Sequence, residues 1–415
     1  MKKLFILLFL PLYLCAELSL DIERRRDQFL TDYGYFAAPV PYSIPGIGQG
    51  VALFAMGNNI YETQTDVLFH LIDGDVGGYG FGIGDLFLVD EHFKLDIFQN
   101  RLDKASIQSY SSRGMASDEN DYLNIQIKES QFTALRATVS FYEKMLEFYF
   151  MNYINKFSFD SLTDQNGELV LGTDNSLSYD IRSYIFGFML DYTDDRLDPR
   201  EGLRFDASID YAPTDEAGSA DFFVTSYNTT LYIPVGIRST WAFNYFRSDA
   251  HVIHEGTTDY ATLATDMDLD CTLIVDLTKR SRCENVINNA IAANKYGTAT
   301  SLGGRGRLRS YPEGRFKGAH TQFYGTEFRW NATGERKPFD IWFMKDIRTA
   351  LQIAFFYERG SVADIRSDLG HDEHESYGSG IRMITASGLV YRLDIAQGNE
   401  GVEATMFINY PWEIF

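Results

Sequence analysis

The stretch GLRFDASIDYA (202–212) alternates apolar and polar residues with a period of two. This alternation predicts a β-strand, because successive side chains of a strand point to opposite sides. The apolar face carries Leu203, Phe205, Ala207, Ile209 and Tyr211, and the polar face carries Arg204, Asp206, Ser208 and Asp210. Because the polar face carries several charges, we expect it to meet water while the apolar face meets lipid.

The same alternation recurs in IRSTWAFNYF (237–246), ALQIAFFYE (350–358) and LVYRLDIA (389–396). Strands are predicted at 179–192, 202–212, 221–233, 237–248, 321–331, 347–358, 376–386, 388–396 and 403–412. Residues 48–157 supply about seven more, for a total near sixteen, as in even-numbered bacterial barrels. The predicted fold class is all-β, a transmembrane antiparallel β-barrel of about sixteen strands.

Composition agrees with a barrel, since 15% of the residues are aromatic and 45% are hydrophobic. Beyond the N-terminus, no apolar run reaches the roughly 20 residues of a spanning helix. A soluble secreted β-protein is the alternative that composition leaves open. The net charge of −21 argues against nucleic acid as a partner, because such binding calls for basic patches.

The first residues read as an export signal. Lys2 and Lys3 precede an apolar run that ends near Ala16, which predicts a signal peptide over 1–16. Cys15 leaves lipidation as the alternative. We expect a short periplasmic N-terminal segment over 17–47 and the barrel over 48–415.

The region 249–320 is a very long connection, which is typical of a functional or disordered loop. Its part 276–297 is expected to contain a short helix. Cys271 and Cys283 lie in it, and they form either one disulfide bridge or two free thiols. The turn TDDRLDPREG (193–202) is by contrast polar and proline-containing.

The stretch LGGRGRLRSYPEGRFKG (302–318) resembles the conserved sixth external loop of BamA/TamA-type outer-membrane assembly barrels. In that family a Gly-Gly pair precedes a Val-Arg-Gly-Phe/Tyr tetrad. Here the pair is Gly303-Gly304 and the tetrad is Leu308-Arg309-Ser310-Tyr311, with Ser310 in place of the family glycine. Further landmarks follow the family order: DDRLDPREG, EFRW (327–330), FFYERGSV (355–362), SYGSGIRM (376–383), GLVYRLDIA and TMFINYPW (405–412).

The resemblance implies a long external loop that plugs the lumen through an arginine paired with an acid on the wall. It maps Arg309 to that arginine, and alternation places Glu358 on the inward face opposite it. Glu327 and Asp394 are expected as further lumenal acids. The alternative is that Arg309 contacts only solvent or lipopolysaccharide. The family's N-terminal periplasmic repeat domains have no room before the predicted barrel, so the resemblance is to a subgroup without them.

Catalytic and metal sites are not expected. HDEHE (371–375) contains five potential metal ligands, but a solvated external loop is the preferred interpretation. Gly378-Ser379-Gly380 lacks the spacing of a nucleophile elbow. We therefore predict a non-enzymatic protein with no cofactor.

The expected function is outer-membrane biogenesis, that is, insertion or translocation of protein or lipid in the cell outer membrane. Expected partners are outer-membrane lipid and lipopolysaccharide, with unfolded outer-membrane proteins or a periplasmic partner as further candidates. A passive pore for small solutes is the alternative, and a barrel hydrolase is a third class. For the last strand, alternation predicts Ile408, Tyr410 and Trp412 on the outward face, and Pro411 a poorly bonded end.

Overall fold

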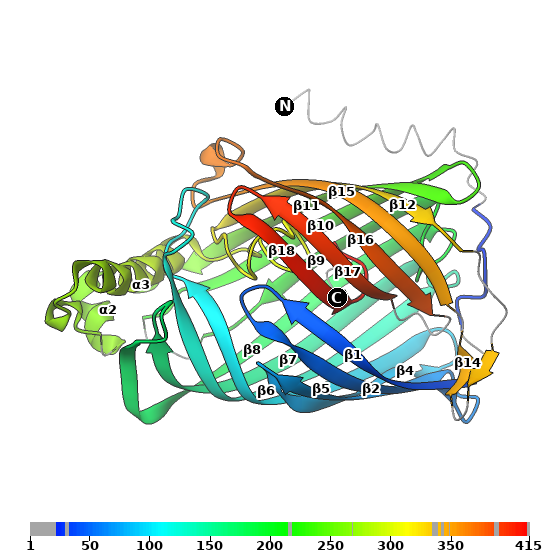
Figure 1. Cartoon of the computed structure of the whole chain (residues 1–415), viewed down its shortest axis with the longest axis horizontal. Coiled ribbons are helices and arrows are strands. Elements are labelled where there is room, and N and C mark those ends of the chain that lie inside the picture. Colours follow the sequence, from blue (N-terminus) through cyan, green and yellow to red (C-terminus); the bar gives the residue numbers. More distant parts are fainter. Residues whose placement is uncertain are drawn as a thin grey trace.

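A computed structural model describes residues 22–29, 33–214, 218–267, 269–333, 339–341, 344–347, 349–385 and 390–412. These residues form a closed antiparallel barrel of sixteen strands, which confirms the predicted fold class and strand number (Figure 1). The predicted signal peptide over 1–16 lies outside the described residues. Among the described helices, none is long and apolar enough to cross a membrane.

The barrel strands follow one another around the wall as a meander in which each strand pairs with its sequence neighbours. Their bounds are β1 (Gly34–Ile44), β2 (Gly48–Ile60), β3 (Thr65–Gly74), β4 (Gly77–Val89), β5 (Phe93–Tyr110), β6 (Tyr122–Phe141), β7 (Leu146–Thr163), β8 (Leu169–Thr193), β9 (Gly202–Tyr211), β10 (Asp221–Val235), β11 (Ser239–His254), β12 (His320–Asn331), β15 (Thr349–Ala363), β16 (His374–Thr385), β17 (Val390–Gly398) and β18 (Gly401–Ile408). β13 (Phe339–Ile341) and β14 (Met344–Ile347) pair with each other in the connection between β12 and β15.

The barrel begins earlier than the predicted boundary at residue 48. β1 starts at Gly34 and pairs with β2 along its whole length, from Gly34 to Ile44. Pro39 and Pro41 interrupt the strand pattern of this segment in the sequence. A strand tolerates proline where its missing N–H faces an edge that is not fully bonded, and β1 has such an edge.

Outward side chains follow the predicted alternation. Trp241, Phe243 and Tyr245 of β11 are exposed, and their neighbours Ala242 and Phe246 are buried. The same holds in β15, where Phe355 and Tyr357 are exposed and Phe356 and Glu358 are buried. The inward face is therefore enclosed, and the large apolar side chains outside are available to lipid.

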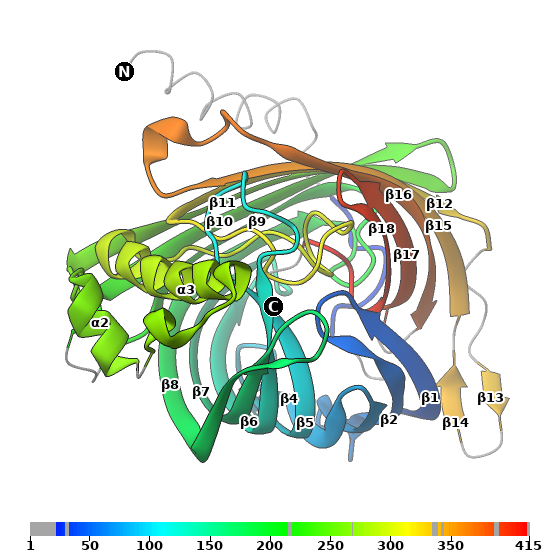
Figure 2. The same ribbon diagram turned by 60° about the vertical axis from the view of Figure 1, so that its left-hand side comes forward.

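The two ends of the barrel differ. The loop end carries the long connection between β11 and β12, including α2 (Tyr260–Asp266), η1 (Cys271–Leu273) and α3 (Leu277–Tyr296) (Figure 2). α3 is the helix that the sequence predicted, and Asp276 caps its start by accepting from the N–H groups of Thr278 and Lys279. The opposite end, here called the terminal end, is where β1 begins and β18 ends.

A small lobe at the loop end is held by the bridge between Cys271 and Cys283. Both cysteines are buried with Leu263 and Ile287 in a separate apolar cluster. The lobe therefore has a core of its own, apart from the barrel lumen.

Candidate functional site

The middle of the long connection turns back into the lumen. This loop segment (302–316) is closed on itself by an antiparallel bridge between Leu302 and Phe316. Leu302, Leu308, Tyr311 and Phe316 are fully buried and pack in one cluster with inward side chains of the wall. The loop segment is therefore a packed plug, visible inside the barrel in Figure 2.

Arg309 lies at the centre of this plug with no exposed side-chain surface. Its Nε lies 2.9 Å from Glu358 Oε1, its Nη1 2.8 Å from Asp394 Oδ2 and its Nη2 3.2 Å from Glu327 Oε2. Its backbone N–H also donates to Glu358 Oε2 at 2.9 Å. The structure thus brings together all four residues that the resemblance implied, from the loop and from β12, β15 and β17.

Three further arginines complete the cluster, and the resemblance did not imply them. Arg329 Nε lies 2.7 Å from Glu327 Oε1, Arg382 donates to both oxygens of Glu327, and Arg392 pairs with Asp394. All three arginines are buried. Each carboxylate therefore has at least two charged or polar donors, which is what burial of a charge requires.

Glycines on the wall make room for the plug. An added Cβ at Gly380 would lie 1.9 Å from Asp394 Oδ1, and one at Gly398 would lie 2.3 Å from Ser310 Oγ. In the loop itself Gly303 has φ 101°, and an added Cβ there would lie 2.4 Å from the Pro312 carbonyl oxygen. The Gly-Gly pair is therefore needed for backbone geometry.

Ser310 replaces the family glycine without backbone strain. Among the tetrad residues it is Leu308 that has a positive φ, of 53°. The Ser310 N–H donates to Ser376 Oγ at 3.0 Å. The tight turn spans 308–311, closed by the Tyr311 N–H donating to the Leu308 carbonyl at 3.1 Å, and its positive φ is at Leu308. Ser310 lies inside this turn without a positive φ, so serine is accommodated.

The end of the chain corrects the sequence prediction. β18 ends at Ile408, and the tail (409–412) turns into the lumen, where Tyr410 and Trp412 are 6% and 1% exposed. Both were predicted to face outward. The reason is Asn409, whose φ of 77° reverses the alternation, a conformation that asparagine tolerates better than most residues.

The tail is fixed to both the plug and the wall. The Trp412 indole N–H donates to Glu358 Oε1 at 2.9 Å, and the Trp412 backbone N–H donates to the Gly306 carbonyl at 3.2 Å. Its own carbonyl accepts from Asn228 Nδ2 at 2.7 Å and from Arg307 Nη2 at 3.2 Å. The tail and the loop segment therefore share the carboxylate of Glu358.

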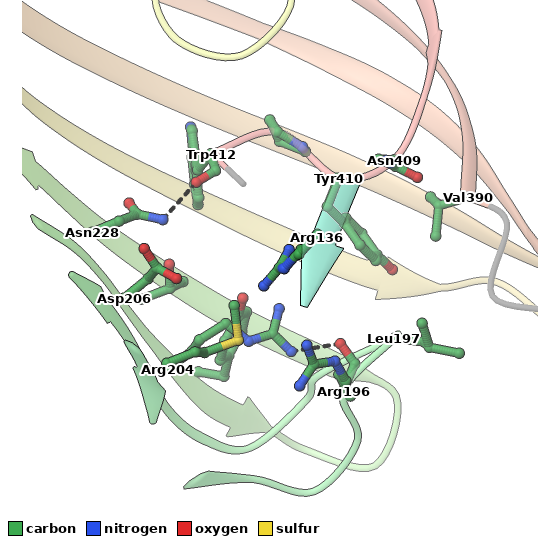
Figure 3. Close-up of a pocket in the computed structure, with 14 residues that line it drawn as sticks. Arg136, Arg196, Leu197, Arg204, Asp206, Asn228, Val390, Asn409, Tyr410 and Trp412 are labelled. Atoms are coloured by element: carbon green, nitrogen blue, oxygen red, sulfur yellow. Dashed lines mark hydrogen bonds between the residues drawn. The ribbon is translucent and has the colours of Figure 1, made fainter. Parts of the chain in front are cut away.

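A cavity of about 240 Å³ separates the tail from the opposite wall (Figure 3). Arg136, Arg196 and Arg204 line it on one side, and Asn409, Tyr410 and Trp412 on the other. On the side toward the terminal end, the Tyr410 hydroxyl donates to Asp198 Oδ1 at 2.7 Å. The tail thus spans the distance between the plug and the turn that joins β8 to β9.

The first and last strands meet along a poorly bonded seam. Among the described residues β1 and β18 pair at a single position, Ser43 with Met406. Extending this antiparallel register would place Pro41 opposite Ile408 and Pro39 opposite Tyr410. The Pro41 carbonyl instead accepts from the Tyr391 hydroxyl of β17 at 2.7 Å.

The prolines explain why pairing stops there. In an antiparallel strand the N–H and C=O of one residue face the same neighbour, so the nitrogen of Pro41 faces the seam and has no hydrogen to donate. Pro39, two residues away, faces the same side. At the start of β1, Tyr35 pairs with Lys345 of β14, so β14 occupies an edge that β18 does not reach.

The HDEHE stretch (371–375) leads into β16. Among the described residues no group of three potential ligands is suitably arranged. His374 begins β16. Its Nδ1 is hydrogen-bonded to the Tyr311 hydroxyl at 3.1 Å, and its ring stacks on that of Phe316. Glu373 pairs with Arg359. This stretch therefore holds the plug at the loop end.

Alternation could have identified some of the residues that the sequence prediction missed. Arg329 and Arg382 share the inward parity of Glu327 and Gly380 in their strands. Arg315, which pairs with Glu400 at 2.8 Å, and Arg113, which pairs with Asp364 at 2.6 Å, join loops that are distant in sequence. No local pattern signals those pairs.

No protein-family model and no curated protein matches the sequence. Among solved structures, CdiB from Escherichia coli has a TM-score of 0.51 at 10% identity over 91% of this chain and 61% of CdiB. CdiB from Acinetobacter baumannii has a TM-score of 0.46 at 11% identity over 91% and 59% of the two chains. BamA from Haemophilus ducreyi lacking POTRA domains 1–3 has a TM-score of 0.47 at 10% identity over 91% and 69%.

This chain thus spans about three-fifths of the length of the two CdiB chains. At this level of identity the likeness concerns the fold alone. With its sixteen strands, the chain has a closed antiparallel β-barrel fold like that of CdiB from Escherichia coli.

Proposed function

We propose that this protein is a non-enzymatic barrel of the outer membrane that acts in outer-membrane biogenesis, by inserting or translocating protein or lipid. In this proposal the terminal end faces the periplasm and the loop end faces the outside. The observation that carries the proposal is the seam between β1 and β18.

The seam is the weakest join of the wall. Each other pair of neighbouring barrel strands forms a ladder of at least seven paired residues, the number between β3 and β4, whereas among the described residues β1 and β18 share the one pair of Ser43 and Met406. Each missing backbone hydrogen bond lowers the stability of the pairing between β1 and β18 by about 1 kcal/mol. Opening at this seam gives a substrate a route from the lumen to the membrane without unfolding the barrel.

The plugged lumen argues against a passive pore. The loop segment and the tail fill the centre with buried side chains, including Arg309, Tyr311 and Trp412. An open channel would require the cluster around Glu358 to be broken. A stable, large conductance of the wild-type protein in a planar lipid bilayer would favour the pore instead.

The partners follow from the same surfaces. Outward aromatic and aliphatic side chains such as Trp241, Phe355 and Ile395 suit outer-membrane lipid, and the loop end would contact lipopolysaccharide. Unfolded outer-membrane proteins or a periplasmic partner would approach the terminal end. No step of the proposed function uses a bound cofactor or a nucleophile of the chain.

Depletion of the protein in its native host tests the proposal. We expect lower levels of other outer-membrane components with uptake of small solutes unchanged. Loss of solute uptake with a normal outer-membrane composition would support the pore and contradict the proposal. Lipid hydrolysis that a serine-directed reagent abolishes would contradict it in favour of a hydrolase.

A further inference from the structure

The segment ahead of β1 binds the far side of the barrel. This clasp segment (22–29) contains Arg24, Arg25 and Arg26 and lies on the acidic turn (194–201) that joins β8 to β9. The two parts are about 170 residues apart in sequence, as the separation of 169 between Arg25 and Asp194 shows. This contact involves neither the loop segment of the plug nor the paired residues of the seam.

Arg25 makes the largest number of contacts with the acidic turn. Its Nη2 lies 2.9 Å from Asp195 Oδ2, 3.3 Å from Asp198 Oδ2 and 2.6 Å from the Asp198 carbonyl oxygen. Its Nε lies 3.2 Å from Asp194 Oδ2, and its backbone N–H donates to the Asp194 carbonyl at 2.7 Å. One side chain and its backbone thus use five acceptors of the turn, and the planar guanidinium suits this fork of acceptors better than an ammonium group would.

Its two neighbours extend the contact in both directions. Arg24 donates to the carbonyls of Thr193 and Asp191, at 2.8 Å and 3.1 Å, and Arg26 Nε lies 2.7 Å from Asp195 Oδ2. Beyond the arginines, Gln28 accepts from the Arg196 N–H at 2.9 Å, and Phe29 is buried beside Phe87. The barrel therefore contacts the clasp segment along its length. Its arginines make charged contacts with the turn, and Phe29 at its C-terminal end is buried.

The contact is charge-assisted and still reachable by solvent. The side chains of Arg25 and Arg26 are each 22% exposed, whereas Asp195 and Asp198 are buried. Burial alone would raise the pKa of Asp198, but Arg200 and Arg25 hold that pKa below its ordinary value. With these arginines beside it, Asp198 therefore keeps its negative charge in the turn although it is buried.

We propose that the acidic turn is a recognition surface for extended arginine-bearing segments, which the chain's own Arg24–Arg26 fills until such a segment of a second protein at the terminal end displaces it. The chemistry of the partner follows from the occupant seen here: consecutive arginines in an extended backbone, followed by an aromatic residue. The proposal goes beyond the proposed function and holds whichever substrate the barrel handles.

Displacement of the clasp segment would also affect the lumen, because Asp198 contacts both the clasp segment and the tail. The same carboxylate accepts from Tyr410 of the tail at 2.7 Å and contacts Arg25. The occupant of the turn therefore shares a residue with the tail, and the tail continues directly from β18 at the seam. A partner bound to the turn would therefore lie next to the tail, and release of the tail would free the end of β18.

Peptide binding to the purified full barrel tests the proposal. The probe is a fluorescent peptide of residues 21–30, DIERRRDQFL, and the measurement is fluorescence anisotropy. A matched peptide with lysine at the three arginine positions is the control. The barrel is used as wild type and as the triple variant R24Q/R25Q/R26Q, in which the cradle is free.

We expect the arginine peptide to bind the triple variant at least about tenfold more tightly than wild type, because the tethered clasp competes at high effective concentration. Adding Asp195→Asn and Asp198→Asn should weaken binding by at least about tenfold, since two charged acceptors are lost. The lysine peptide should bind more weakly. Equal binding to both barrels, no effect of the two Asn changes, or no displacement from wild type at high peptide concentration would each overturn the proposal.

Folding is checked separately by the heat-dependent shift of the barrel band in gel electrophoresis. If the triple variant does not fold, the single variant Arg25→Gln is used, which removes the most extensive contact and keeps Arg24 and Arg26. The same outcomes then apply to it. None of these measurements depends on insertion or translocation activity, so failure here is distinguishable from failure of the proposed function.

Discussion

The Trp412 indole and the Arg309 guanidinium share one acceptor: both donate to Oε1 of Glu358, each at 2.9 Å. Arg309 belongs to the plug and Trp412 to the tail that continues from the last strand. Glu358 on β15 is therefore the point at which the lumen plug, the wall and the end of the chain are joined.

Glu358→Gln should destabilise the barrel strongly. The amide keeps the shape of the side chain but removes the charge that Arg309 pairs with, and loss of one partner of a buried ion pair costs about 3–5 kcal/mol. Urea unfolding in detergent or lipid, followed by the heat-dependent band shift, measures the change. The matched control is Glu373→Gln, whose partner Arg359 is 49% exposed, and here we expect less than about 1 kcal/mol.

Trp412→Phe tests the tail separately from the plug. Phenylalanine keeps most of the buried ring but cannot donate to Glu358, so the variant should lose about 1–3 kcal/mol. The tail should also become accessible to carboxypeptidase while the barrel stays folded. An unchanged rate of carboxypeptidase digestion would show that the indole contact does not hold the tail.

Gly380→Ala should disturb the cluster from the wall side. The added methyl group would lie 1.9 Å from Asp394 Oδ1, so Asp394 must move away from Arg309. We expect a loss of about 1–3 kcal/mol for this overpacking. Gly306→Ala is the control, because nothing lies within 4 Å of an added Cβ there, and wild-type stability in both variants would contradict the packing described.

Replacing Cys271 and Cys283 with serine should loosen the lobe and leave the barrel intact. The bridge closes a loop with a sequence separation of 12, for which the entropic stabilisation is about 3 kcal/mol. Limited proteolysis should cut between α2 and α3 in the variant, with no change in the heat-dependent band shift. Simultaneous loss of the folded barrel band would show that the lobe is not an independent unit.

Period-two alternation was enough to predict the nine barrel strands from β8 onward and their outward faces, because it depends only on neighbouring residues. Over 48–157 it predicted about seven strands where the structure has six, β2 to β7, and the remaining strand is β1 at Gly34–Ile44. It also put Glu358 and Asp394 on inward faces, whereas the resemblance added Arg309 through the loop motif and Glu327 through EFRW (327–330). The tail escaped prediction since a single left-handed residue, Asn409, reverses the alternation after Ile408.

Other contacts lay beyond any local pattern. Arg25 and Asp198 are 173 residues apart in sequence and meet only because β8 and β9 lie across the barrel from β1. Pro39 and Pro41 hid β1 in the sequence, yet they are the residues that leave its edge unbonded. The two prolines that interrupt the strand pattern of β1 in the sequence thus lie at the seam.

Cross-linking the seam tests the central claim most directly. Ser43 and Met406 are paired across β1 and β18, and Cα atoms of paired residues lie about 4.5–5.5 Å apart, within the range of a disulfide. The variant S43C/M406C should therefore close the seam when oxidised. Q99C/T133C joins β5 to β6, which pair without interruption from Phe93 to Leu102, and serves as the control.

Both variants are introduced into the native host in place of the wild-type protein, and the levels of other outer-membrane components are measured before and after reduction. The account predicts that the oxidised S43C/M406C barrel fails to support outer-membrane biogenesis and recovers on reduction, while Q99C/T133C is active throughout. Full activity of the S43C/M406C barrel with its seam demonstrably cross-linked would contradict the account.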